Sequence, residues 1–320
     1  MSVHDIMNNV IQRFETCVSV SSAQDAVRNR LIAPGICFSQ ERIALRTPHA
    51  DSDGRTIWVH EAYLNFLWCI IYALLTIEEE GLRKPLLAKT FTGSVDFINP
   101  LLQAANLSFQ WALSLRHHFS SWPTYLPRPH DAGMTDPGDY VGKANAVFIE
   151  AMTLALCHEY SHLVHKQIEI IKEITNKPVK ERTPAEVSTL LSIEREADNF
   201  ALGSLINFQD EDSKKHVSAL SSLLMYCANL LLLETPYLVA QEIHPDLDQR
   251  LDNVIRVSGI QDDARNESLK LTACFACRKF FDLHQITIAE PSTPTVDQLY
   301  DYYMAVFDHI KEIARSEIRQ

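Results

Sequence analysis

The residues best suited to chemistry lie in one short segment. Leu156–His162 reads Leu-Cys-His-Glu-Tyr-Ser-His, so that His158 and His162 are four residues apart. On a helix this spacing places both imidazoles on one face, about one turn apart, where their ring nitrogens can bind a single zinc ion. Glu159 would then reach a water on the metal and take its proton as the water attacks a carbonyl. The segment predicts one Zn²⁺ per chain, with Glu159 as general base.

A catalytic zinc site needs a third protein ligand and an open fourth position. Glu194 and Asp198 lie downstream, four residues apart, and share a helix face with Ala197 and Ala201. These small residues would let the second helix approach the histidine-bearing helix closely. We therefore expect Glu194 to bind zinc and Asp198 to accept the free N–H of a ligand histidine, which fixes the tautomer of that ring. The alternative is a solvated charged face on an amphipathic helix.

Three further sets of residues are weaker candidates. His244 precedes Pro245 in a loop expected to cap a helix. It could stabilise the oxyanion opposite the metal, or only form a hydrogen-bonded cap. His165 follows His162 by three residues and could approach the site or lie on the helix surface. Cys274 and Cys277 have zinc-knuckle spacing, but no second such pair exists, so we expect them on a buried helical face.

The elements that must position these residues are mostly helices. Thr183-Pro184-Ala185-Glu186 combines an N-cap, a proline at the first helical position and a glutamate two residues later, which predicts a helix start. Apolar periodicity predicts helices at about 3–18, 62–77, 95–118, 144–173, 183–206, 213–234, 246–257, 263–284 and 295–316.

One part of the chain has strand periodicity instead. Two short strand-like segments, 43–46 and 56–60, flank the turn residues 48–54, which predicts a β-hairpin. A stretch with four prolines, 119–143, has no regular pattern. We expect a mainly α fold with a small N-terminal β-hairpin, in which residues 1–90 form a possible subdomain beside a helical domain of residues 91–320.

Composition excludes several classes of protein. There are 29 Lys and Arg against 41 Asp and Glu, a net charge of −12, so nucleic acid is not an expected partner. Seven scattered cysteines are typical of reduced thiols in a cytosol, and the first residues lack the features of a secretory signal. The most apolar segment, 62–75, is shorter than the ~20 residues that span a bilayer. We therefore expect a cytoplasmic protein in which this segment is a buried core helix, with membrane-surface attachment as the alternative.

The paired motifs His-Glu-x-x-His and Glu-x-x-x-Asp resemble those of the gluzincin metallopeptidases. More narrowly, the chain resembles the Lit-type phage-exclusion peptidases, and the resemblance spans about 120–251, less than half of the chain. Four segments carry it in order: Ser121-Trp122-Pro123 with Pro127-Arg128-Pro129, His158-Glu159-Tyr160-Ser161-His162, Glu194-Arg195-Glu196-Ala197-Asp198, and His244-Pro245 with Asp248-Gln249-Arg250-Leu251.

This resemblance implies a zincin-like, cytoplasmic bacterial endopeptidase that is latent until infection. Its protein substrate would be elongation factor Tu, cleaved when a phage-derived capsid segment engages it. Two alternatives remain open. The third-ligand segment is also similar to that of ImmA-type peptidases, which cleave transcriptional repressors. A non-catalytic scaffold could instead use zinc only to stabilise its fold, in which case a fourth Cys or His ligand should close the metal site.

Overall fold

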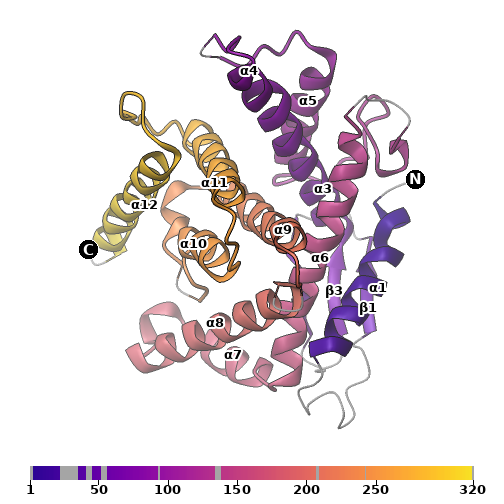
Figure 1. Ribbon diagram of the computed structural model, residues 1–320. Helices are drawn as coiled ribbons and strands as arrows, with labels where there is room; N and C mark the ends of the chain where they lie inside the picture. The colour runs from indigo at the N-terminus through magenta and orange to yellow at the C-terminus, as the bar shows by residue number, and fades with distance from the viewer. Residues whose placement is uncertain are drawn as a thin grey trace.

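The computed structural model describes residues 3–21, 35–40, 45–51, 56–92, 94–133, 138–206, 209–241 and 243–318. Helices dominate these residues, which confirms the mainly α fold (Figure 1). The N-terminal elements are α1 (His4–Ser21), β1 (Gly35–Ser39), β2 (His49–Ala50), β3 (Thr56–His60), α3 (Glu61–Thr76), the π-helix η1 (Ile77–Arg83) and α4 (Lys84–Leu87). They are followed by α5 (Pro100–Ser114), η2 (Pro129–Asp131), α6 (Tyr140–Val164), α7 (Ile168–Thr175), η3 (Val179–Glu181), α8 (Pro184–Ile206), α9 (Asp212–Leu231), η4 (Pro236–Val239), α10 (Leu247–Val257), α11 (Asp263–Leu283) and α12 (Val296–Ile318).

The predicted β-hairpin is a three-stranded sheet in the order β1-β3-β2. β1 runs parallel to β3, while β2 is antiparallel to it, with His49 opposite Trp58. The antiparallel partner of β3 therefore lies within the segment predicted to be a turn. Leu45 and Arg46 are in no strand, and residues 43 and 44 lie outside the described part of the chain. The hairpin itself is present as β2 and β3, but the predicted position of its first strand was wrong, because β2 is held by contacts with α6 that local sequence preferences do not encode.

The long helix predicted over 144–173 is interrupted. α6 ends at Val164 and α7 begins at Ile168, because Lys166 adopts left-handed backbone geometry with φ of 54°. The N–H of Gln167 then donates to the carbonyl of His162 at 3.0 Å, which turns the chain back toward the helix end. No glycine or proline marks this break in the sequence, so periodicity alone could not locate it.

The helices pack around α6, which contacts α1, α3, α8 and α9. Figure 1 shows the helices α10, α11 and α12 gathered on the side of the molecule away from α1 and β1. One connected hydrophobic core contains buried residues from both of the predicted units, such as Trp68 and Phe148. The division into residues 1–90 and 91–320 stays a prediction.

Within the described part of the chain, two helical stretches are long and apolar enough to cross a membrane by length and composition: Glu61–Leu87 and Tyr140–Val164. Within their most apolar windows, 89% and 67% of the residues are buried inside the protein. Both stretches therefore occupy the position of core helices.

The stretch predicted to be irregular, 119–143, is described over 119–133 and 138–143, where it contains the short helical turn η2 and the start of α6 at Tyr140. Its first part packs on the core through an aromatic contact. The ring of Trp122 lies 5.5 Å from that of Trp68 on α3 and 5.0 Å from that of Trp111 on α5. Trp122 therefore fixes this segment to the core.

Candidate metal centre

Two neighbouring helices carry the candidate site. α6 presents His158, Glu159 and His162, and α8 presents Glu194 and Asp198. The two helices pack directly against each other. On the packed face of α8, Ala197 and Ala201 are buried, and their small side chains permit the close approach that the sequence predicted. α8 begins as predicted, because Thr183 and Glu186 form a reciprocal capping box.

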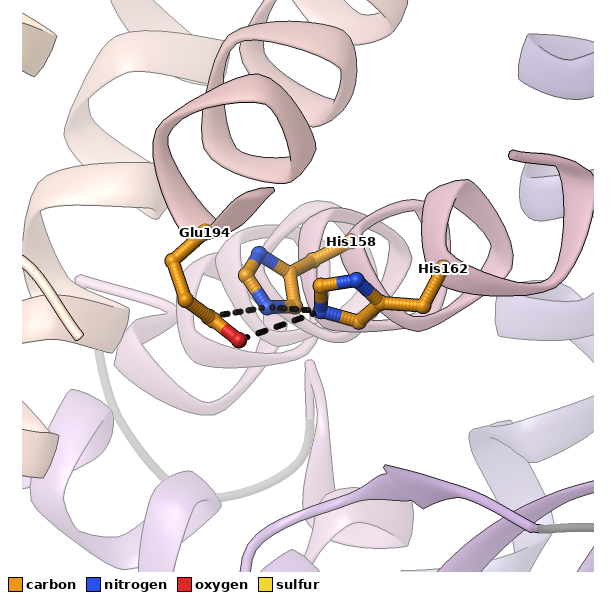
Figure 2. Close-up of side chains that lie close together, drawn as sticks. All are labelled: His158, His162 and Glu194. Atoms are coloured by element: carbon orange, nitrogen blue, oxygen red, sulfur yellow. Dashed lines mark hydrogen bonds and ion pairs between the residues drawn. The ribbon is translucent and has the colours of Figure 1, made fainter. Parts of the chain in front are cut away.

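The side chains of His158, His162 and Glu194 converge on one point (Figure 2). The two Nε2 atoms are 3.2 Å apart. Glu194 places Oε2 at 3.3 Å from Nε2 of His158 and Oε1 at 3.5 Å from Nε2 of His162. All three residues are largely removed from solvent. Among the described residues, this is the one group of three or more His, Cys, Asp or Glu side chains close enough to share a metal ion.

Hydrogen bonds at the other ring nitrogen fix the tautomer of each histidine. Nδ1 of His158 donates to Oδ1 of Asp198 at 2.9 Å, since a carboxylate can only accept. Nδ1 of His162 lies 3.0 Å from Oε1 of Gln167. The amide nitrogen of Gln167 donates to Glu196 at 3.1 Å, so its oxygen faces the imidazole. Nε2 of each ring is therefore directed toward the carboxylate of Glu194, where it offers a lone pair whenever the ring is neutral.

This donor set fits a zinc ion. Two nitrogens bound at about 2.05 Å to a tetrahedral zinc lie about 3.3 Å apart, close to the observed 3.2 Å. With both histidines neutral, three acceptor groups would face one another in a buried site, and a cation is needed to compensate them. Burial opposes a charge on His158, yet hydrogen bonds to Asp198 and Glu194 prevail and raise its pKa to about 10. The centre therefore attracts positive charge, either as a proton or as a metal.

Asp198 is itself held by two residues. Arg250 on α10 donates to both of its carboxylate oxygens at 2.7 Å, and the hydroxyl of Tyr226 on α9 donates to Oδ1 at 3.1 Å. Although burial raises the pKa of Asp198, the charges of Arg250 and His158 outweigh burial and hold this pKa well below its usual range. Asp198 is therefore an anionic acceptor for His158, which is the contact that the sequence predicted.

Glu159 lies beside the three converging side chains and is half-buried. Burial raises its pKa to about 7, against the opposing effects of His158 and of a backbone hydrogen bond from Ala50. The N–H of Ala50 donates to Oε2 of Glu159 at 2.7 Å. The N–H of Asp51 donates to the carbonyl of Thr56 in β3. Because neighbouring N–H groups along a strand point to opposite sides, the N–H of Ala50 points away from β3, at the outer edge of β2. A carboxylate with a pKa near 7 is suited to take and return a proton at neutral pH.

The structure places His244 next to the predicted third ligand. Its Nδ1 lies 2.6 Å from Oε2 of Glu194, and its side chain is 43% exposed. The predicted role of His244 as an oxyanion stabiliser stays a prediction. His165, the weaker candidate, is exposed at the end of α6, where Nδ1 lies 3.1 Å from the hydroxyl of Ser161. Cys157, Cys274 and Cys277 are buried and unpaired, in agreement with the helical-face interpretation.

A pocket of about 270 Å³ opens onto this centre. His158, Glu159 and His244 line it on the polar side, and Met225 and Leu233 contribute apolar surface. The pocket therefore gives an external group access to the carboxylate of Glu159 and to the ring of His158.

Sequence reasoning missed four residues that support the site. Gln167 follows a helix break that was not predicted, and Tyr226 is distant from both motifs in the sequence. Ala50 contributes only its backbone N–H. Arg250 stands in a segment that carried the family resemblance, but its partner Asp198 could not be assigned without knowing that α10 packs on α9 and brings Arg250 to α8. One signal could have found this pair. Asp198 was expected to be buried, and a buried carboxylate needs a positively charged partner such as Arg250.

Comparison with known families assigns the chain to the peptidases, so it is a protease. The family model, described as Peptidase U49, matches residues 57–270, about two thirds of the 320 residues. The chain belongs to the peptidase U49 family. The matched region includes α6, α8 and the loop before α10, and hence each residue predicted for the site. No curated protein and no solved structure gives a significant match.

Proposed function

We propose that this protein is a zinc-dependent endopeptidase whose zinc is held by His158, His162 and Glu194. The observation that carries the proposal is the convergence of two Nε2 lone pairs and one carboxylate at zinc-ligand spacing, with Glu159 beside them in an open pocket. When bound, zinc would supply the Lewis acid that activates a water and polarises the scissile carbonyl.

The residues of the chain would then move the proton and hold the geometry. Glu159 takes the proton of the attacking water and returns it to the leaving amine, since its pKa of about 7 suits both directions. The N–H of Ala50 holds one oxygen of Glu159 and so orients the other. Asp198 keeps His158 in the tautomer that leaves Nε2 free. His244, at the mouth of the site, is proposed to stabilise the oxyanion.

The substrate is proposed from the Lit-type resemblance together with the peptidase family. It is a cytoplasmic protein, with elongation factor Tu as the first candidate and a phage-derived segment as the trigger. Among the described residues, no fourth side chain joins the three converging ligands, which disfavours the scaffold alternative. A repressor substrate, as in ImmA-type peptidases, is the alternative within the protease class.

The test is a comparison of newly formed protein N-termini in bacteria that express the wild type or Glu159→Gln, with and without phage infection. Glu169→Gln is the matched control, because Glu169 is exposed on α7 and loses the same charge. We expect new N-termini with the wild type and with Glu169→Gln, and their loss with Glu159→Gln. Equal fragments with Glu159→Gln would reject the proposed mechanism, and the identity of the cut protein separates elongation factor Tu from a repressor.

A further inference from the structure

A second pocket, of about 480 Å³, adjoins the metal-centre pocket. It is lined by Arg46, Thr47, His49, Arg116, Glu234 and two leucines, and we call it the basic pocket. Thr47 and Leu232 line both pockets, so the two spaces are neighbours along the segment that leads into β2. A peptide held at the metal centre can therefore extend into the basic pocket.

Arg116 gives the basic pocket a positive charge that no carboxylate neutralises through an ion pair in the described part of the chain. It is half-buried, and one Nη donates to the carbonyl of Leu231 at 3.2 Å, while Nε is buried with no hydrogen-bond partner. In the described part of the chain, no carboxylate lies within ion-pair distance of this guanidinium. Burial lowers the pKa of Arg116, and the charge of Glu234 opposes this effect. An arginine nevertheless keeps its charge in proteins, so the group lacks an anionic partner.

The charges around Arg116 do not supply that partner. Arg46 adds a second guanidinium to the pocket lining, against the single carboxylate of Glu234. The formal balance of these three side chains is therefore positive, although the whole chain carries a net charge of −12. Guanidinium groups bind carboxylates through paired, charge-assisted hydrogen bonds.

We propose that the basic pocket binds an acidic side chain of the substrate, Asp or Glu, while the scissile bond lies at the metal centre. This inference rests on the proposed function, because the metal centre fixes where the peptide is cut. An extended peptide advances about 3.3 Å per residue, so adjoining pockets correspond to an acidic residue within a few positions of the scissile bond. Arg46 and Arg116 are then specificity-determining residues.

The test uses short peptide hydroxamates, whose hydroxamate group binds zinc and whose peptide part can reach the basic pocket. A series carries Glu at each of four successive positions, and a matched series carries Gln there. Their dissociation constants are measured by calorimetry on the zinc-loaded full chain. We expect at least one Glu probe to bind ~10-fold more tightly than its Gln counterpart, and this ratio to fall at high salt.

Variants of the lining residues give opposite expected shifts. Arg46→Gln and Arg116→Gln should each reduce the preference for Glu, whereas Glu234→Gln should increase it by removing a competing carboxylate. Arg46 is exposed, so its substitution tests the pocket without disturbing the core. Arg265→Gln, which removes the same charge at the start of α11, should leave the preference unchanged.

Two negative results have different meanings. If no hydroxamate binds, the proposed metal centre is wrong, and this inference falls with it. If the probes bind but the Glu and Gln series have equal affinities at every position, the basic pocket alone is rejected. A preference for Glu that survives in both Arg46→Gln and Arg116→Gln would also overturn the assignment.

Discussion

The metal centre depends on which nitrogen of each histidine is free. His158 and His162 both donate through Nδ1 to acceptors outside the centre, so both present Nε2 to Glu194. The acceptors differ, because Asp198 is an anion and Gln167 is a neutral amide. The two rings are therefore expected to contribute unequally to metal affinity, with His158 the more strongly basic ligand.

Two nearby carboxylates provide a sharp test of the ligand assignment. Glu194 faces the histidines, whereas Glu196 is exposed and binds Gln167 instead. We expect Glu194→Gln to lose zinc, because a neutral amide is a poor ligand, and Glu196→Gln to retain about one zinc per chain. Zinc content is measured by mass spectrometry after dialysis. Retention in the first variant and loss in the second would reverse the assignment.

Asp198 should affect the metal without binding it. Asp198→Asn removes the anionic acceptor of His158 and one half of the pair with Arg250. The expected result is a zinc affinity lower by ~10 to 100-fold, measured by competition with a chelating dye. Asp252→Asn, at an exposed position on α10, is the control. An unchanged affinity in Asp198→Asn would show that this hydrogen bond does not tune the site.

At the scale of elements, the break between α6 and α7 brings Gln167 back to the metal helix. Lys166 takes up the left-handed conformation that allows this return. Gln167→Leu should lower zinc affinity by ~10-fold, because Nδ1 of His162 loses its acceptor, whereas Gln167→Glu should preserve the affinity. Lys166→Gly, which keeps the turn, is the matched control. Equal affinities for Gln167→Leu and the wild type would remove Gln167 from the site.

The elements differ in how far the sequence determines them. α8 could be predicted closely, because its capping box, its apolar stripe and its small residues are all local features of its own sequence. The position of β2 could not be predicted, since β2 contacts α6, which is distant in the sequence. The break at Lys166 could not be predicted either, because the residue after it, Gln167, binds Glu196 on the neighbouring helix α8. In the site, the spacing of His158 and His162 is a local property, whereas the bonds of Asp198 to Arg250 and Tyr226 require α9 and α10 to be in place.

At the scale of the whole molecule, the C-terminal helix supports the site from outside the region matched to the family. Lys311 on α12 is buried and donates to Asp248 at the start of α10 at 2.7 Å. Two residues further along α10, Arg250 holds Asp198. α10 therefore carries two ionic contacts, one from Asp248 to the C-terminal helix and one from Arg250 to Asp198, which in turn binds His158.

Stability should depend on pH through a carboxylate that is not part of the metal centre. Glu78 is buried and accepts from Thr272 on α11, and burial raises its pKa to about 7. The folded state therefore binds an extra proton between about pH 4.5 and 7, so stability falls as pH rises through this range. Glu78→Gln should increase the free energy of unfolding at pH 8 by up to about 3 kcal/mol, with little effect near pH 4.5.

Urea unfolding at both pH values measures this difference. Glu79→Gln, at the next position of the π-helix, is the control, because Glu79 is paired with Arg83 nearer the surface. A stabilisation of Glu78→Gln that is the same at pH 4.5 and pH 8 would contradict the assigned cost of burying the charge.

Crystals of the zinc-loaded protein, measured on both sides of the zinc absorption edge, test the proposed metal centre most directly. We expect one anomalous peak per chain, about 2.0–2.2 Å from Nε2 of His158, Nε2 of His162 and a carboxylate oxygen of Glu194, with no fourth protein ligand. Absence of a peak at this point, or a fourth protein side chain such as His244 completing the coordination, would contradict a catalytic zinc centre.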